Sequence, residues 1–184
     1  KKMVDCFVAI SPETHTEMAQ MGFPHIALIP NGVDTVRFCP PTVPRVELKH
    51  RLLPQYAGRK WVLFVGKFDQ QKNIPLLFDV ARLLPDNYLI IIVGDGELRG
   101  VFEEKIRDLR LQDKILLYGI TPEIEKIYQS ADVFVLPSHA EGLPNALLEA
   151  LSSGLLCIGS DIAGIRALIT PGVNGYVVPR GDAD

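Results

Sequence analysis

The sequence has few cysteines, no surplus of basic residues and no long apolar run. Its three cysteines lie far apart and form no C-x-x-C pair, which predicts free thiols in a reducing compartment. A net charge of −3 gives none of the basic excess that favours nucleic-acid binding. The longest apolar runs, such as residues 88–93, are too short to span a bilayer. We therefore expect a globular, cytoplasmic protein.

The chain also has no internal repeat and no low-complexity segment; instead, short apolar runs alternate with segments of helical apolar spacing. The expected strands are residues 7–10, 26–29, 61–65, 89–93, 115–118, 133–136, 155–159 and 176–178. The expected helices are residues 75–84, 98–111, 124–130 and 145–153, with a further short helix between 40 and 54. Alternating strands and helices pair in parallel, because a helix returns the chain. The pattern predicts an α/β fold with a doubly wound parallel sheet.

The most informative stretch follows the expected strand 133–136. A loop with Glu141 passes through Pro144 into a helix that carries Glu149. Such a strand-to-helix turn directs backbone N–H groups and a positive helix end at a ligand, and nearby carboxylates can accept its hydroxyl groups. The stretch predicts a site for a phosphate-bearing sugar. The ordinary alternatives are that Glu141 caps the helix and that Glu149 faces solvent.

Two lysines follow the expected strand 61–65. Gly66 allows a tight exit from that strand, and Lys67 and Lys72 lie in the loop after it. Ligands bind at the carboxyl ends of the strands in open α/β sheets, where two ammonium groups can neutralise a diphosphate. The alternative is a solvated loop with ordinary surface lysines.

A glycine-rich turn follows the expected strand 89–93. Gly94 and Gly96 resemble the start of a phosphate loop, but Gly100 lies one residue too late for G-x-G-x-x-G. A dinucleotide site is therefore not predicted. A tight turn and a close approach to a ligand remain equally open.

Metal and hydrolase chemistry find no support in the sequence. His139 has no second histidine or cysteine at ligand spacing, and Ser138 lacks a surrounding G-x-S-x-G elbow. No metal site and no serine hydrolase triad are predicted.

In combination, these motifs resemble the family-four (group 1) retaining glycosyltransferases, which have the GT-B fold. The resemblance covers nearly the whole chain, and Glu141 and Glu149 match the E-x7-E motif of that family. The other matching stretches are Ser11-Pro12-Glu13, residues 29–34 with Phe38, residues 65–72, residues 94–96, Gly119 and residues 131–138.

The resemblance implies a Rossmann-like doubly wound sheet that forms one half of a two-domain GT-B enzyme. Residues 1–22 would be the last strand and helix of an N-terminal acceptor domain. Residues 23–184 would be the nucleotide-sugar-binding domain, ending before its final helices. The enzyme would transfer a sugar from a UDP- or GDP-sugar to an acceptor, with retention, and the fragment alone would bind donor but be inactive. It would lie in the cytoplasm, at the inner face of the membrane, with any membrane contact made through the missing domain.

The resemblance also implies roles for individual residues. Lys67 and Lys72 would clamp the diphosphate, and Glu141 would contact the donor sugar near the reacting carbon; these three form the expected catalytic set. Glu149 would bind the ribose hydroxyls. The remaining expected donor contacts are the amides of Gly142, Leu143 and Asn145, the strand-exit residues Gly66 and Gly94, and the backbone of Ile120 against the base. No metal and no other cofactor would be required.

Three departures from the family pattern keep other functions open. Lys67 stands where arginine is usual, Gly154-Leu155-Leu156 replaces the usual Gly-x-Pro after the helix, and residues 163–167 replace Gly-Gly-x-Pro-Glu. Lys67 and the lost Gly-Gly-x-Pro-Glu motivate the alternative of a non-catalytic nucleotide-sugar-binding module. A further alternative is an enzyme similar to the UDP-sugar epimerases, which can share this fold, although the scattered histidines do not supply the acid/base residues that it would need.

Overall fold

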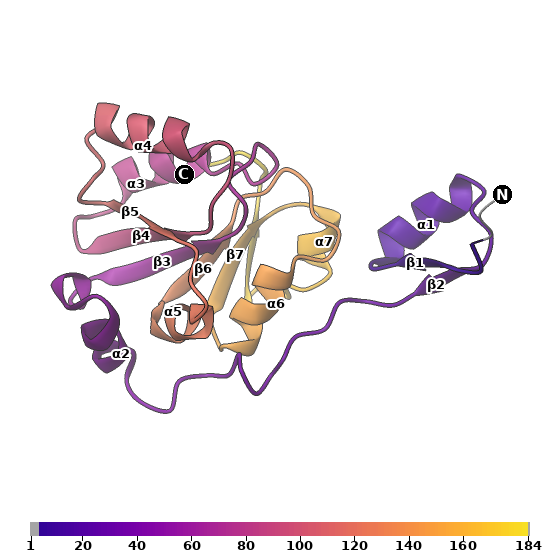
Figure 1. The fold of residues 1–184 in the computed structure, drawn as a ribbon, viewed down its shortest axis with the longest axis horizontal. Helices are drawn as coiled ribbons and strands as arrows, with labels where there is room; N and C mark the ends of the chain where they lie inside the picture. The colour runs from indigo at the N-terminus through magenta and orange to yellow at the C-terminus, as the bar shows by residue number, and fades with distance from the viewer. Residues whose placement is uncertain (1–3, 184) are drawn as a thin grey trace.

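The computed structural model describes residues 4–183. The chain begins with a small unit of strand β1 (Phe7–Ala9), helix α1 (Pro12–Gln20) and strand β2 (Ile26–Leu28). The two strands pair in parallel, and the Ser11 hydroxyl caps α1 by accepting the Thr14 amide at 3.1 Å. Figure 1 shows this unit beside the main body, to which an extended segment connects it. The Ile10 side chain, between β1 and α1, lies close to the main body, since a Cβ atom on Gly142 would be 3.1 Å from Ile10 Cδ1.

The main body is built on one parallel sheet of six strands. The spatial order is β5-β4-β3-β6-β7-β8, and every neighbouring pair runs parallel. The strands are β3 (Lys60–Val65), β4 (Tyr88–Val93), β5 (Ile115–Gly119), β6 (Val133–Leu136), β7 (Leu156–Ser160) and β8 (Gly175–Val178). The predicted doubly wound parallel sheet is confirmed.

Helices cover both faces of this sheet. They are α2 (Arg45–Leu52), α3 (Pro75–Leu83), α4 (Arg99–Asp108), α5 (Ile124–Ser130), α6 (Asn145–Ser152) and α7 (Ala163–Arg166), with a 3₁₀ turn at Pro54–Tyr56. In Figure 1, α3 and α4 lie on one face, and α5 and α6 lie on the other. The chain changes direction across the sheet between β3 and β6, which places a topological switch point at their carboxyl ends.

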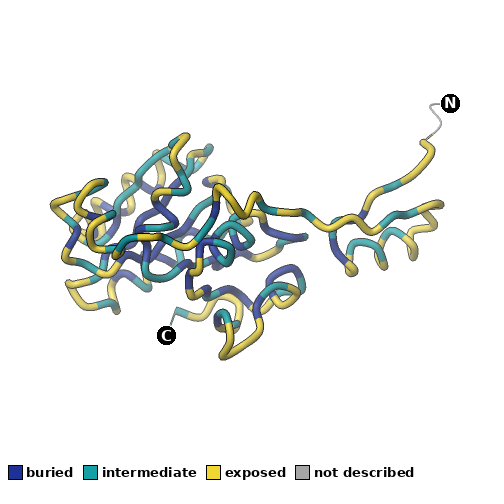
Figure 2. The backbone as a smooth tube through the Cα atoms, turned by 90° about the horizontal axis from the view of Figure 1, so that it is seen from below, coloured by how far each residue is buried: buried dark blue, intermediate teal, exposed yellow. Residues whose placement is uncertain are grey.

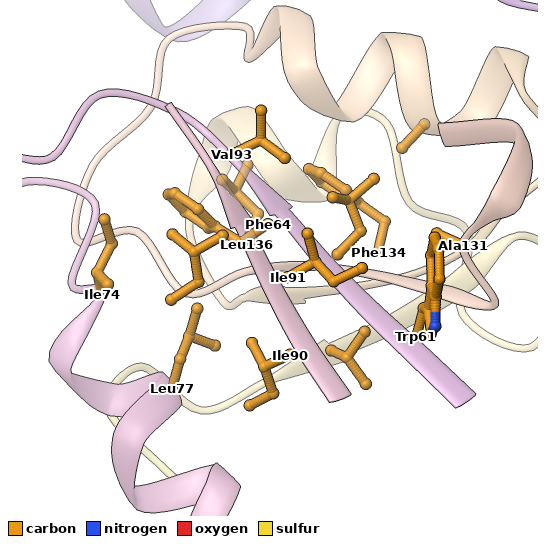
Figure 3. Packing of buried hydrophobic residues seen from close by; sticks show 14 of the residues in the cluster. Trp61, Phe64, Ile74, Leu77, Ile90, Ile91, Val93, Ala131, Phe134 and Leu136 are labelled. Carbon is orange, nitrogen blue, oxygen red and sulfur yellow. The ribbon is translucent and has the colours of Figure 1, made fainter. Parts of the chain in front are cut away.

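The core lies on the two central strands and is buried from both sides. Trp61, Leu63 and Phe64 of β3 are fully buried, which explains the uninterrupted apolar runs of the sequence. Figure 3 shows strand side chains packed with Ile74, which precedes α3, and Leu77 of α3. Exposed residues mark the first unit and the connecting segment in Figure 2, whereas buried residues gather in the main body.

A largely buried ion pair anchors α2 at the amino ends of the central strands β3 and β6, opposite the switch point. Lys49 Nζ lies 2.5 Å from Asp132 Oδ2 and donates to the Arg59 carbonyl at 2.9 Å. The same carboxylate oxygen accepts the Trp61 amide at 2.6 Å. This network joins α2 to the amino end of β3 and to the residue before β6.

Most differences from the expected elements concern their ends. The helix expected over 98–111 ends at Asp108, because Arg110 adopts a positive φ of 55°. The short helix expected between 40 and 54 is α2, whereas α7 was not predicted. The boundary drawn between residues 22 and 23 falls inside the first unit, since β2 pairs with β1. Residues 1–3 and 184 of the expected domains lie outside the described residues. None of the helices in the described part of the chain is long and apolar enough to cross a membrane.

Candidate functional site

Two loops meet at the switch point, one after β3 and one after β6. The amide of His139 donates to the Gln71 carbonyl at 2.8 Å, and the Gln71 side chain donates to the Ala140 carbonyl at 2.7 Å. Asp69 stabilises the first loop by accepting the Lys72 amide at 3.1 Å. The two predicted parts of the site, separated by about 70 residues of sequence, are thereby held side by side.

The Lys72–Glu141 cluster, which also contains Ser138, lies between these loops. Lys72 Nζ is 2.6 Å from Glu141 Oε1, and the Ser138 hydroxyl donates to the same oxygen at 2.7 Å. The side chains of Lys72 and Glu141 are only 19% and 7% exposed. Both donors use Oε1, so Oε2 of Glu141 accepts no hydrogen bond from the described residues. The cluster is a largely buried ion pair with one carboxylate oxygen available.

The turn into α6 presents free backbone donors beside this cluster. Pro144 precedes the helix and provides no side-chain cap. Among the described residues, the amides of Gly142, Leu143 and Asn145 have no acceptor. The Asn31 side chain fixes the turn by donating to the Leu143 carbonyl at 3.0 Å. Free amides at a helix start suit an anion or a hydroxyl oxygen.

The same turn rests on α7 through a glycine that the sequence analysis did not select. A Cβ atom on Gly164 would lie 2.3 Å from the Gly142 carbonyl oxygen and 2.4 Å from that of Glu141. Only glycine fits such a close backbone approach. Gly164 belongs to the stretch 163–167 that departs from the family pattern, so the one glycine left there supports the loop that carries Glu141.

Glu149 is paired with a hydroxyl group rather than with a cation. Glu149 lies on α6 and is half-buried, and its Oε2 accepts the Tyr128 hydroxyl at 2.9 Å. Burial raises the pKa of Glu149, while the Tyr128 hydrogen bond and the charge of Arg37 act in the opposite direction. The alternative of a solvent-facing glutamate is therefore wrong for Glu149.

Five of the predicted residues line one depression of about 310 Å³ at the carboxyl ends of β3, β4 and β5. They are Gly66, Lys67, Gly94, Ile120 and Glu149. Gly94 has a φ of +134°, and a Cβ on it would lie 1.9 Å from the Gly66 carbonyl oxygen. The glycine turn thus lets two strand exits approach closely. A Cβ atom on Gly66 would lie 3.7 Å from Cδ of Lys72. The Lys72–Glu141 cluster is therefore next to the depression.

The two predicted lysines have different environments. The Lys67 side chain is 59% exposed and its ammonium lies 3.5 Å from Glu97 Oε1, itself 86% exposed. An exposed pair of this kind contributes little to stability. The Lys67 side chain is thus exposed at the depression that it lines, whereas Lys72 is held in the largely buried pair.

The sequence analysis missed Tyr128, Gly164, Asn31 and the role of Ser138. Tyr128 reaches Glu149 from a neighbouring helix, 21 residues away in sequence, and no spacing rule connects the two. Within the described residues, no group of three or more histidine, cysteine, aspartate or glutamate side chains is arranged to hold a metal ion.

Comparisons with known proteins agree with this architecture. The sequence is 39% identical over 166 residues to an Escherichia coli UDP-Gal:α-D-GlcNAc-diphosphoundecaprenol α-1,3-galactosyltransferase, covering 86% of this chain and 42% of that protein. It is 32% identical over 150 residues to the lipopolysaccharide 1,6-galactosyltransferase of Escherichia coli K12, covering 74% of this chain and 41% of the relative. The chain therefore spans less than half the length of these two relatives.

A similar fold occurs in the crystal structure of HepE from Anabaena in complex with UDP and glucose. The TM-score is 0.88 at 21% identity, over 99% of this chain and 51% of that one. The family model for glycosyl transferases group 1 matches residues 46–184, which include the whole six-stranded sheet and both loops of the site. The chain belongs to the group 1 glycosyl transferases.

Proposed function

We propose that this chain is the donor-binding part of a two-domain enzyme that transfers a sugar from a nucleotide-diphosphate sugar to an acceptor, with retention of configuration. One observation carries the proposal: the Lys72–Glu141 cluster, the free amides before α6 and the depression that reaches Glu149 all meet at the switch point. An ammonium group and free amides suit a diphosphate, and carboxylate oxygens suit sugar hydroxyls.

The proposed donor is a UDP-sugar. The name of the Escherichia coli relative specifies UDP-Gal, and the HepE structure contains UDP. The base would lie against the backbone at Ile120 and the ribose against Glu149, both of which line the depression. The diphosphate would extend past Gly66 and Lys72, and the sugar would reach Oε2 of Glu141.

The chemistry of this site would be electrostatic. Departure of the nucleoside diphosphate develops negative charge on its phosphate oxygens. Lys72 uses one of its three N–H groups for Glu141, and the others remain available for that charge. The start of α6 adds its free amides. Donors fixed in advance around a developing charge are often the largest catalytic contribution, and we propose that they make a divalent metal unnecessary.

Calorimetric titration of the chain with UDP, GDP and ADP tests the donor site. We expect UDP to bind equally well in EDTA and in magnesium, and Glu149→Ala to abolish the binding because the ribose loses its acceptor. Glu104→Ala, on the exposed side of α4, is the matched control for Glu149→Ala. Lys60→Ala, at the exposed amino end of β3, is a second control, in which a lysine far from the site is removed. Failure of all three nucleotides to bind would contradict the proposal, and a preference for GDP would change the donor class.

Transfer itself is tested in the protein that includes the acceptor domain. Glu141→Ala and Lys72→Ala should each lower kcat by about 100-fold, as the loss of one fixed charge-stabilising group does. We expect the chain without its acceptor domain to bind UDP-sugar but not to transfer it, because no acceptor is positioned. Retention is read from the anomeric configuration of the product by NMR. A bound donor that is neither hydrolysed nor transferred would support a non-catalytic module instead.

A further inference from the structure

Tyr128 is a fully buried tyrosine whose hydroxyl reaches the edge of the proposed ribose site. Its ring packs edge-on against Phe38 at 5.7 Å between centroids and tilted against Phe134 at 5.9 Å. The hydroxyl lies 2.9 Å from Glu149 Oε2 and 3.2 Å from the Ala146 carbonyl oxygen. One hydroxyl proton serves one acceptor at a time, and the charged oxygen is the nearer.

The environment of the Tyr128 hydroxyl keeps it protonated, so that it remains a hydrogen-bond donor. Burial, together with the neighbouring Glu149 charge, raises the pKa of the Tyr128 hydroxyl well above its ordinary value. The hydroxyl therefore keeps its proton over the whole physiological range. A buried hydroxyl without a partner is costly, so the aromatic packing and the hydrogen bond together fix where Glu149 Oε2 lies.

The other oxygen of Glu149 remains available. No described residue donates a hydrogen bond to Oε1, and Glu149 lines the depression beside Ile120 and Thr121. A carboxylate held by one oxygen and open at the other is arranged to accept further hydroxyl groups without losing side-chain freedom on binding.

We infer that Tyr128 is a positioning residue for donor binding: its hydroxyl holds Oε2 of Glu149 so that Oε1 faces the depression and accepts the ribose hydroxyls. The inference rests on the proposed function and deepens it. Tyr128 touches no part of the donor in this arrangement and acts through Glu149.

The connecting segment braces the two helices that carry this pair. The Phe38 ring packs on Tyr128 of α5, and the Phe38 carbonyl accepts the Ser152 hydroxyl of α6. Arg37 donates to the Pro122 carbonyl at 2.8 Å and pairs with Glu125 at 2.9 Å, just before and within α5. The spacing between α5 and α6, and hence the Tyr128–Glu149 hydrogen bond, is thereby fixed from outside.

A pair of ligands and a pair of variants test the inference. Tyr128→Phe keeps the aromatic ring and removes the hydroxyl, and Tyr88→Phe, at the opposite end of β4, is its matched control. We expect Tyr128→Phe to weaken UDP binding by about tenfold, the scale of one hydrogen bond to a charged group. With dideoxy-UDP, which lacks both ribose hydroxyls, Tyr128→Phe should cause no further loss. Tyr88→Phe should leave both affinities unchanged.

The pH profile adds a readout that simple loss of packing does not move. The groups that face Glu149 are Tyr128 from α5 and Arg37 from the connecting segment. Lys67 and Asp95 line the same depression. Cys157 of β7 is a minor contributor to the raised pKa of Tyr128. Removing the hydroxyl removes a group that lowers the pKa of Glu149, so UDP affinity should begin to fall at a higher pH in Tyr128→Phe. The phosphates of UDP titrate identically in each variant.

Each outcome decides. The positioning role is supported if Tyr128→Phe loses about tenfold in affinity for UDP, loses none for dideoxy-UDP, and begins to lose UDP affinity at a higher pH than wild type. Equal losses of affinity for UDP and dideoxy-UDP, or an unchanged pH at which UDP affinity falls, would overturn the inference and leave the proposed donor site intact. Wild-type binding that is equally strong for both ligands would remove the ribose contact and the inference with it. Absence of UDP binding to the wild-type chain would overturn the proposed function as well.

Discussion

The two glutamates of the E-x7-E motif lie at the same sheet edge, yet their environments differ. Glu141 is largely buried with an ammonium and a hydroxyl on one oxygen. Glu149 is half-buried beside a neutral hydroxyl, and burial raises its pKa. A full opposite charge compensates the first carboxylate, whereas the second is only partly compensated. Both carboxylates are held by one oxygen, but only the charge of Glu141 is balanced by a cation within hydrogen-bond distance.

Removing the cation from the Lys72–Glu141 cluster should have the largest effect on this comparison. In Lys72→Met, Glu141 keeps its buried position but loses its charged partner, which should cost about 3 kcal/mol of unfolding free energy. Urea denaturation measures the change. Lys60→Met, in an exposed position on β3, is the control and should change stability by less than about 0.5 kcal/mol. Equal stability of the two variants would contradict the burial of the pair.

The close packing of Gly164 against the loop that carries Glu141 should give the second-largest effect. Gly164→Ala places a Cβ within 2.4 Å of two carbonyl oxygens of the Glu141 loop and should cost about 2 kcal/mol. It should also weaken nucleotide-sugar binding, because the loop must move. Gly100→Ala in α4, where a Cβ has open space, should instead stabilise the chain by about 0.5 kcal/mol. Denaturation midpoints of both variants check the opposite signs.

The incomplete compensation of the Glu149 charge predicts a pH dependence of stability. Because folding raises its pKa above the ordinary 4.5, its contribution is fully present below that value and is lost as the pH rises through the raised pKa. Glu149→Gln lacks this loss, so its stability relative to wild type should grow between pH 4.5 and pH 7. Thermal unfolding of both proteins across this range measures it. A constant difference would contradict the raised pKa.

Arg37 should produce the smallest change. Its charge lowers the pKa of Glu149, so Arg37→Gln should move the pH dependence of the previous experiment to slightly higher pH. The side chain is 46% exposed, and solvent screening limits the shift. Arg51→Gln, on α2 at 68% exposure, should leave the profile in place. A shift in the opposite direction would contradict the assigned role of the Arg37 charge.

The sequence predicted the fold well, since the period of its apolar residues reflects burial directly. Residues 61–64 and 89–93 are buried as their continuous apolar runs indicate, and Val65 at the end of β3 is partly buried. The four-residue helix α7 escaped because it is too short to show a period. Gly94 was correctly recognised as a strand exit, but its close approach to Gly66 joins two segments that only the sheet brings together.

The site was predicted less completely. Sequence motifs placed Lys72, Glu141 and Glu149 at the sheet edge, and the structure brings them there. The motifs treated Lys67 and Lys72 alike, although one side chain is exposed and the other is paired in the interior. Exposure depends on which loop packs over a residue, and a residue's own neighbours in sequence do not carry that information.

The sequence by itself determined the alternation of strands and helices, the parallel sheet and the polar residues that follow each strand. Backbone sterics and apolar periodicity act locally and are therefore written along the chain. Only the tertiary structure decided that Ser138 shares an oxygen of Glu141 with Lys72, that Gly164 supports their loop and that Tyr128 holds Glu149. These contacts join elements far apart in sequence, and their energies depend on distance and burial, which exist only once the sheet has formed.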